Sequence, residues 1–433
     1  MIRCLVLIDG EHYPSVIETA VAALRSEGYV AVAAMFLGGT EKAGRLDLGI
    51  PVEAGDTEAR LVELIARHQA DLVFDLSDEP VLDHRQRFRL VGAALRAGVA
   101  YAGGGFRFDP PLRPVLTELP AVAISATGKR TGKTAVSIEL ARHWRAVGRR
   151  VCIVTMGRGG PPEPVVLHAG ELEPPVAGLQ GLARRGLHAA SDYVEDALLA
   201  GVDTVGTFRC GAGPSGRTVS DNFSLGVNAA IELDPDVLIF EGSGSALPPA
   251  AAGASVLVIP SDLDPEYLRG YFGPYRLALG DAVVVTGGVD SGPEAAEIST
   301  IIAKIEPELS VFAARYTPEP TVSVAGRSVL VATTAPPEAG EEIVNALMAM
   351  EAGRVVTLHN LADRTALAED LDAVARPDLV LVEVKAAAVD TVLPWADARG
   401  IEAGLLHNRV QLPGGIQELA IVLEERWGAT LRG

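Results

Sequence analysis

A lysine, a threonine and several glycines stand at the spacing of a loop that binds phosphate. The segment SATGKRTGKT, residues 125–134, ends in Gly132, Lys133 and Thr134, as the consensus G-x-x-x-x-G-K-[ST] requires. In such loops the glycines permit unusual backbone angles, the lysine reaches the β- and γ-phosphates of a nucleotide, and the hydroxyl holds Mg²⁺. Thr127 replaces the first glycine, so the motif is a variant. The alternative is a surface turn rich in Gly and Lys.

The segments on either side favour the phosphate-binding interpretation. The apolar run AVAIS precedes the loop and the amphipathic run TAVSIELARHWRAVG follows it, which predicts a strand, a loop and a helix. Loop amides and the helix N-terminus then point toward the phosphates. We therefore expect ATP and Mg²⁺ as ligands, with nucleotide contacts from Thr127, Gly128, Arg130, Thr131, Gly132, Lys133 and Thr134.

A second acidic group for the metal is expected from VLIFEGSG, residues 237–244. Glu241 ends an apolar strand-like run and is followed by Gly-Ser-Gly, which leaves room for a substrate. Carboxylate and hydroxyl oxygens are suitable Mg²⁺ ligands, so Thr134 and Glu241 are the predicted metal residues. Alternatively, Glu241 only caps the next helix.

Two further Gly-rich segments carry arginines that can bind a second anion. TMGRGGPPEPVV, residues 155–166, holds Arg158 and Gly159, and TFRCGAGPSGRT, residues 207–218, holds Arg209 and Arg217. Guanidinium groups bind phosphate in a bidentate manner. Ordinary turns with surface arginines remain the alternative.

The first hundred residues contain two acidic loops, DGEHYP and DLSDEP, after strand-like runs. They contribute Asp9, Glu11 and His12, then Asp75, Asp78 and Glu79. Acids at adjacent strand ends can contact a substrate or a cation, and Asp9, Glu11 and His12 are the predicted substrate residues here. Solvated acids that cap helices are the commoner case. His188 is expected to be a surface or structural residue.

Overall composition excludes several classes of protein. The 433 residues carry a formal net charge of −19, which repels nucleic acid and anionic membranes. A phosphate ligand then requires locally gathered cations, although the chain has only five lysines: Lys42, Lys129, Lys133, Lys304 and Lys385. Cys4, Cys152 and Cys210 are far apart and predict neither a disulfide framework nor a zinc site. The N-terminus is unlike a signal peptide and no long apolar run follows, so we expect a cytoplasmic protein.

Alternating apolar and amphipathic segments predict an α/β fold in three parts. Residues 1–118 form an N-terminal α/β domain, residues 119–326 a P-loop ATP-binding domain with a mostly parallel sheet, and residues 327–433 a smaller C-terminal α/β domain. The proline-rich stretch DPPLRPVLTELP, residues 109–120, reads as a linker.

Together these motifs resemble the cyclic 2,3-diphosphoglycerate synthetases. The similarity rests on LIDGEHYP, ATGKRTGKT, TMGRGGPPEP and FEGSG, and on the three-part length. The central domain also looks like dethiobiotin synthetase and the cobyrinic acid amide ligases, which have a threonine where Thr127 stands. Related switch ATPases carry a signature lysine where this chain has Gly128, so a switch that uses this lysine across a dimer interface is not favoured.

The resemblance implies that ATP drives closure of a phosphoanhydride between the two phosphates of 2,3-diphosphoglycerate. It implies Lys129, Lys133, Arg158 and Glu241 as catalytic residues, with substrate contacts from Arg158, Gly159, Arg209 and Arg217. The N-terminal domain would act as a lid through Asp9, Glu11 and His12. The segments VVTGGVD and ARYTPEP, with Thr317 and Pro318, would border the nucleotide base.

Other readings stay open at this point. One is an ATP-dependent carboxylate ligase or small-molecule kinase, and another is a non-enzymatic nucleotide switch. The expected partner is a small phosphorylated molecule rather than nucleic acid or membrane, and a homodimer is possible.

Overall fold

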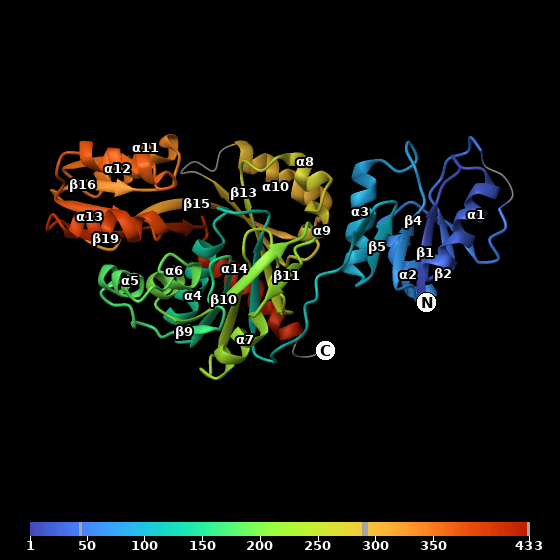
Figure 1. Ribbon diagram of the computed structural model, residues 1–433, viewed down its shortest axis with the longest axis horizontal. Helices are drawn as coiled ribbons and strands as arrows, with labels where there is room; N and C mark the ends of the chain where they lie inside the picture. Colours follow the sequence, from blue (N-terminus) through green and yellow to red (C-terminus); the bar gives the residue numbers. More distant parts are fainter. Residues whose placement is uncertain (43–45, 288–292, 431–433) are drawn as a thin grey trace.

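The computed structural model describes residues 1–42, 46–287 and 293–430, with the side chains of 428–430 left out. The predicted α/β class is confirmed, because strands and helices alternate along the chain and most strand pairs are parallel. Figure 1 shows a blue N-terminal unit at one end, a green and yellow central part, and an orange block at the other end. Among the described residues, no helix is long and apolar enough to cross a membrane.

The N-terminal unit is a six-stranded sheet in the order β3-β2-β1-β4-β5-β6. Residues 4–8 of its central strand β1 are all buried, as expected when both faces of a parallel sheet are covered. Its strands are β1 (Ile2–Ile8), β2 (Tyr29–Phe36), β3 (Val52–Ala54), β4 (Leu72–Asp75), β5 (Ala100–Gly103) and β6 (Phe106–Phe108), and its helices are α1 (Pro14–Leu24), α2 (Glu58–His68) and α3 (His84–Arg96).

A second sheet of thirteen strands runs through the rest of the molecule. Its main path is β11-β10-β8-β12-β7-β13-β14-β15-β19-β18-β16-β17, and β9 pairs with β10. The central strands are β7 (Ala121–Ala126), β8 (Val151–Gly157), β9 (Val165–Leu167), β10 (Asp203–Ala212), β11 (Thr218–Asp221), β12 (Val237–Glu241), β13 (Ala254–Pro260), β14 (Ala282–Gly287) and β15 (Ser310–Pro320). The central helices are α4 (Lys133–Ala146), α5 (Pro175–Arg184), α6 (Asp192–Ala200), α7 (Phe223–Ile231), α8 (Pro265–Arg269), α9 (Gly273–Leu277) and α10 (Pro293–Ile305).

The C-terminal block extends this sheet and does not form one of its own. β19 (Glu402–Gln411) pairs in parallel with β18 (Leu379–Val382) at its start and antiparallel with β15 at its end. The remaining elements are β16 (Ser328–Ala332), β17 (Arg354–Leu358), α11 (Pro337–Ala349), α12 (Arg364–Ala373), α13 (Leu393–Asp397) and α14 (Ile416–Thr430).

The last helix, α14, returns to the centre of the molecule (Figure 1). The rings of Trp144 on α4 and Trp427 on α14 lie 5.1 Å apart, and the indole nitrogen of Trp144 donates to Glu424 at 2.8 Å. The final segment therefore covers the P-loop helix.

An aromatic cluster joins the N-terminal unit to the centre. Phe88 on α3 lies 5.3 Å from both Tyr271 and Phe272, and Phe108 lies 5.2 Å from Phe272. Close aromatic contacts of this kind contribute beyond simple area burial. They hold the N-terminal sheet beside helices α8 and α9.

Candidate functional site

The predicted phosphate loop connects the central strand β7 to the helix α4. Arg130 and Gly132 have positive φ angles of 61° and 93°. A Cβ atom on Gly132 would lie 2.1 Å from the hydroxyl of Tyr316, so only glycine fits there. Because α4 begins at Lys133, the amides of its first turn form a site for anions.

Lys133 lies folded back on the loop. It is 8% exposed, and its Nζ donates to the carbonyl of Gly128 at 3.2 Å. Burial lowers the pKa of Lys133, while Glu241 and Asp192 oppose that shift. The ammonium group has no carboxylate at hydrogen-bond distance among the described residues, and this arrangement suits a lysine that binds phosphate.

Thr134 and Glu241 meet beside the loop. The Thr134 hydroxyl donates to Glu241 Oε1 at 2.6 Å, and Glu241 Oε2 is buried with no hydrogen-bond partner in the described structure. Burial and the nearby Asp192 raise the pKa of Glu241 to about 7. Glu241 ends β12, and no helix follows in residues 242–253, so capping does not explain it. Its oxygens and the Thr134 hydroxyl fit the hard donors that Mg²⁺ prefers.

The structure brings Arg158 and Arg209 together above the loop that follows Glu241. A Cβ atom on Gly244 would lie 3.0 Å from Arg158 Nη2 and 3.3 Å from Arg209 Nη2. Arg209 also donates to the carbonyl of Ser243 at 2.9 Å. Burial lowers the pKa of Arg209, and Arg158 lowers it further. Two adjacent guanidinium groups repel each other, and a bound anion beside them would relieve this repulsion, as the nearby Asp192 does in part.

The residue next to Arg158 contributes backbone to the same region. Gly159 is exposed, and its carbonyl lies 3.5 Å from the hydroxyl of Ser191, at the start of α6. Gly160 lies so close to Thr207 that a Cβ atom would sit 1.9 Å from its carbonyl oxygen. The loop that carries Arg158 is thus held between β10 and α6.

Several predicted residues are exposed, as Arg158 is. Lys129, Arg130 and His188 are exposed. Arg217 is exposed on the loop between β10 and β11, in a depression of about 400 Å³ that Leu112 and Val219 also line. The exposed positions of Lys129, Arg130 and Arg217 do not test whether these residues contact a ligand.

Thr317 and Pro318, which were expected to border the nucleotide base, belong to a long strand and not to a loop after a strand end. They lie within β15, opposite Arg409 and Asn408 of β19. The strand continues because β19 supplies an antiparallel partner. Part of the other expected nucleotide segment, VVTGGVD at residues 284–290, lies outside the described residues from 288 onward.

The N-terminal acids are bound to their own loops. Asp9 is 1% exposed and accepts from the amides of Glu11 and Asp78 at 3.0 and 2.6 Å and from the ring of His12 at 2.8 Å. Asp75 accepts from Arg87 Nε at 2.9 Å and from the Tyr101 hydroxyl at 2.8 Å. Asp9 therefore ties the two acidic loops together, whereas Asp75 ties its loop to α3 and β5.

Glu11 and His12 remain partly accessible. A hydrogen bond with Glu41 raises the pKa of Glu11. The roles of Asp9, Glu11 and His12 toward a substrate stay predictions.

Sequence reasoning missed three buried polar residues next to the site. Asp196 on α6 is fully buried and accepts from the Thr155 hydroxyl at 2.6 Å, while its other oxygen lacks a partner in the described structure. Burial, with Glu241 nearby, raises the pKa of Asp196 well above its usual value. Thr286 donates to the carbonyl of Thr131 at 2.8 Å. Asp196 lies in the acidic run SDYVED, which matches no known motif, and Thr286 lies in VVTGGVD, a segment that was expected to border the nucleotide base and not to support the P-loop.

Arg276 is the third missed residue and joins three segments of the site. It is 2% exposed and donates to the carbonyls of Ala126, Pro214 and Ser245 at 3.3, 3.2 and 2.7 Å. The end of β7, the Arg209–Arg217 loop and the segment after Glu241 are thereby fixed relative to one another.

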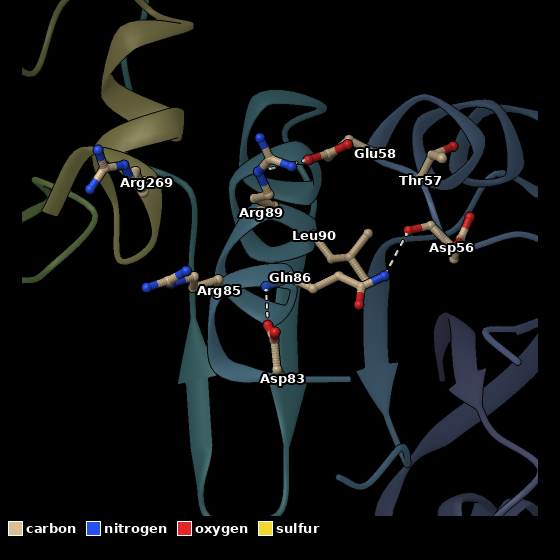
Figure 2. A pocket seen from close by; sticks show the side chains of 9 residues that line it. All are labelled: Asp56, Thr57, Glu58, Asp83, Arg85, Gln86, Arg89, Leu90 and Arg269. Atoms are coloured by element: carbon tan, nitrogen blue, oxygen red, sulfur yellow. Dashed lines mark hydrogen bonds and ion pairs between the residues drawn. The ribbon is translucent and has the colours of Figure 1, made fainter. Parts of the chain in front are cut away.

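A cavity lies elsewhere, between the N-terminal unit and α8 (Figure 2). It has a volume of about 460 Å³ and is lined by charged residues that include Arg85, Arg89 and Arg269. Figure 2 shows Arg89 directed toward Glu58, at 3.4 Å, and Arg85 pairs with Glu266 at 2.5 Å. Because these arginines already have carboxylate partners, the cavity is a charged seam between the units.

Models of one family match successive parts of the chain. The N-terminal domain model of cyclic 2,3-diphosphoglycerate synthetase matches residues 3–109, the P-loop domain model matches 121–314, and the C-terminal domain model matches 320–409. Among solved structures, LpxK from Aquifex aeolicus in complex with ATP aligns over 79% of this chain and 96% of its own, with 12% identity and a TM-score of 0.44.

Full-length relatives carry the same family name. Cyclic 2,3-diphosphoglycerate synthetase from Rubrobacter xylanophilus is 41% identical over 409 residues, which cover 93% of this chain and 92% of that protein. The protein of that name from Thermococcus kodakarensis is 41% identical over 93% of this chain and 94% of its own. The one from Methanothermobacter thermautotrophicus is 38% identical over 95% and 93%. With matches across all three segments, this chain belongs to the cyclic 2,3-diphosphoglycerate synthetase family.

Proposed function

We propose that this protein uses ATP to convert 2,3-diphosphoglycerate into its cyclic phosphoanhydride, with release of ADP and phosphate. The relatives named above carry this activity in their names. The observation that carries the proposal is the convergence of Arg158 and Arg209 over Gly244, three residues after Glu241. This convergence supports a cationic site for a second polyanion beside the nucleotide loop.

Different residues of the chain bind the two anions. Lys133 and the first amides of α4 bind the β- and γ-phosphates of ATP, and Arg158 and Arg209 bind the phosphorylated acid. Thr134 and Glu241 would hold Mg²⁺, which supplies charge neutralisation at the transferring phosphoryl group. Fixed cations in a site of low dielectric are what two polyanions need before they can approach.

We propose two successive steps. An oxygen of one substrate phosphate attacks the γ-phosphorus of ATP, the bond to the ADP oxygen breaks, and the substrate then carries a diphosphate. An oxygen of the neighbouring substrate phosphate next attacks the inner phosphorus of this diphosphate, which is joined to carbon through an ester oxygen. The bond from that phosphorus to the bridging oxygen breaks, and inorganic phosphate leaves. This second step is intramolecular, so orientation by Arg158 and Arg209 can lower its barrier by about 7 to 11 kcal/mol. The protein supplies no covalent nucleophile.

The energised diphosphate must be shielded from water during these steps. The N-terminal unit is our candidate for the shield, with Glu11 and His12 as the accessible groups of its acidic loops. Asp9 would act by holding these loops. Lys129 and Arg130, exposed at the tip of the P-loop, are candidates to close over the bound phosphates.

Phosphorus NMR of the protein with Mg²⁺, ATP and 2,3-diphosphoglycerate tests the proposal. New anhydride resonances from the diphosphoglycerate should rise together with ADP and phosphate, and should be absent with the Lys133→Met variant. ATP cleavage without such resonances, or a phosphorylated side chain trapped during turnover, would refute the proposed reaction. A product that appears only when a nitrogen donor or an acceptor alcohol is added would indicate a ligase or kinase instead.

A further inference from the structure

Helices α4 and α6 both bring residues to the site, and they contact different loops of it. α4 begins at Lys133 and Thr134, on the nucleotide side. α6 begins beside Gly159, in the loop of Arg158, on the side assigned to the phosphorylated acid. Asp196 of α6 is also bonded to Thr155 of β8, the strand that leads into this loop. Asp192 at the start of α6 also lies near Lys133 and Glu241, but the hydrogen bonds of α6 close to the site are made with the loop and the strand of Arg158.

The C-terminal block binds α4 through Glu139. This glutamate is 3% exposed and lies fewer than two helical turns from Lys133. Arg409 of β19 donates from Nε to both carboxylate oxygens, at 3.1 and 3.0 Å. His407 Nε2 lies 3.9 Å from the same carboxylate. A strand about 270 residues away in sequence thus holds the P-loop helix.

The same block binds α6 through Glu195. Lys385, which closely follows β18, donates from Nζ to Glu195 Oε2 at 3.2 Å. The backbone on which Lys385 stands is itself fixed, because the neighbouring Glu383 accepts from the hydroxyls of Thr333 and Thr334 at 2.6 and 2.9 Å. The lysine is therefore presented to α6 from a rigid support.

We propose that Arg409 and Lys385 are positioning residues, by which the C-terminal block holds α4 and α6 and so sets the two halves of the site separately. The inference rests on the proposed function for the assignment of the acid side. Arg409 acts through α4 on ATP, and Lys385 acts through α6 and the Arg158 loop on the phosphorylated acid. Neither residue needs to touch a ligand.

Calorimetric titration of the whole protein tests this division. The probes are a non-hydrolysable ATP analogue with Mg²⁺ and, separately, 2,3-diphosphoglycerate. Arg409→Gln should weaken binding of the ATP analogue, and Lys385→Gln binding of 2,3-diphosphoglycerate, by about threefold to tenfold each, because partly exposed pairs are modest. Each variant should leave the other ligand within about twofold. Lys385→Arg should retain wild-type binding.

A matched control is Arg364→Gln, since Arg364 pairs with Asp390 at 2.6 Å inside the same block without contacting α4 or α6 in the described structure. It should change neither affinity. If Arg409→Gln lowers the melting temperature strongly, Arg409→Lys replaces it in the titrations.

Equal losses for both ligands in each variant, or no loss in either, would overturn the inference. Wild-type protein that binds 2,3-diphosphoglycerate but forms no cyclic product would refute the proposed function alone. The separate effects of the Arg409 and Lys385 variants on the two affinities could still be measured. Wild-type protein that fails to bind 2,3-diphosphoglycerate would refute the role of Lys385.

Discussion

Two sets of loops follow parallel strands in this protein. Their buried acids differ in whether every carboxylate oxygen has a hydrogen-bond partner. In the N-terminal unit, both oxygens of Asp9 and of Asp75 accept hydrogen bonds from protein groups. In the P-loop cluster, polar atoms of Thr127, Thr131, Arg209 and Glu241 are buried with no partner in the described structure. Buried polar atoms are rarely left unpaired without a functional reason.

This difference separates the acids that stabilise loops from the acid that can bind a ligand. Asp9 and Asp75 stabilise loops, because every acceptor they have is used. Glu241 retains an oxygen for a ligand. The two sets look alike in sequence, since each places acids after an apolar run. Substitutions should therefore damage activity in the P-loop cluster and stability in the N-terminal loops.

The largest effect is expected from Lys133→Met. Loss of the buried ammonium, which we propose binds the γ-phosphate, should lower kcat by about 10³-fold, as for other groups that stabilise transition-state charge. Steady-state release of ADP measures it. Lys304→Met, at an exposed position on α10, is the control and should behave as wild type. Near-normal kcat in Lys133→Met would remove the P-loop from the chemistry.

The second largest effect is expected from Arg209→Ala. It should raise the KM for the phosphorylated acid by about 30-fold, because the proposed charge-assisted contact of this buried arginine with the acid is lost. Arg217→Ala serves as a matched comparison from the same Gly-rich segment. Because Arg217 is exposed and away from Gly244 in the described structure, its KM should change less than about threefold. The reverse order would place the acid in the depression beside β11.

Asp75→Asn should affect folding instead of turnover. The variant weakens the bond to Arg87, a partly buried pair, and should lower the free energy of unfolding by about 2 kcal/mol. Urea unfolding measures the change, with exposed Glu27→Gln as control. A strong loss of kcat with unchanged stability would instead make this acidic loop part of the active site.

The smallest effect is a pH dependence of stability at Asp196. Its pKa is raised on folding, chiefly by burial, so folding takes up a proton. Stability is then fully present below the unfolded pKa and declines as pH rises from about 4 toward the folded pKa. Asp196→Asn removes this dependence. The melting temperature of wild type should therefore fall more than that of the variant between pH 5 and pH 8, and parallel curves would contradict the assignment.

Prediction from sequence succeeded where a motif is local. The loop from Thr127 to Thr134 needs only its own glycines, the preceding strand and the following helix, all contiguous in the chain, and the structure has this arrangement. The sequence predicted that cationic side chains gather near the phosphate loop, but it did not predict that Arg158 and Arg209 in particular lie close together. Arg276 and Asp196 could not be found, because nothing in their local sequence reports partners that lie 31 to 150 residues away.

The sequence by itself determined the α/β class, the P-loop and the identity of the charged groups, because these depend on local periodicity and on short motifs. Only the tertiary structure decided which of those groups act together. Strand order placed Glu241 against Thr134, and β19 brought the C-terminal block onto α4. The physical reason is that burial and pairing arise from contacts between distant segments, so a carboxylate that binds a loop and one that retains a free oxygen look the same until the chain is folded.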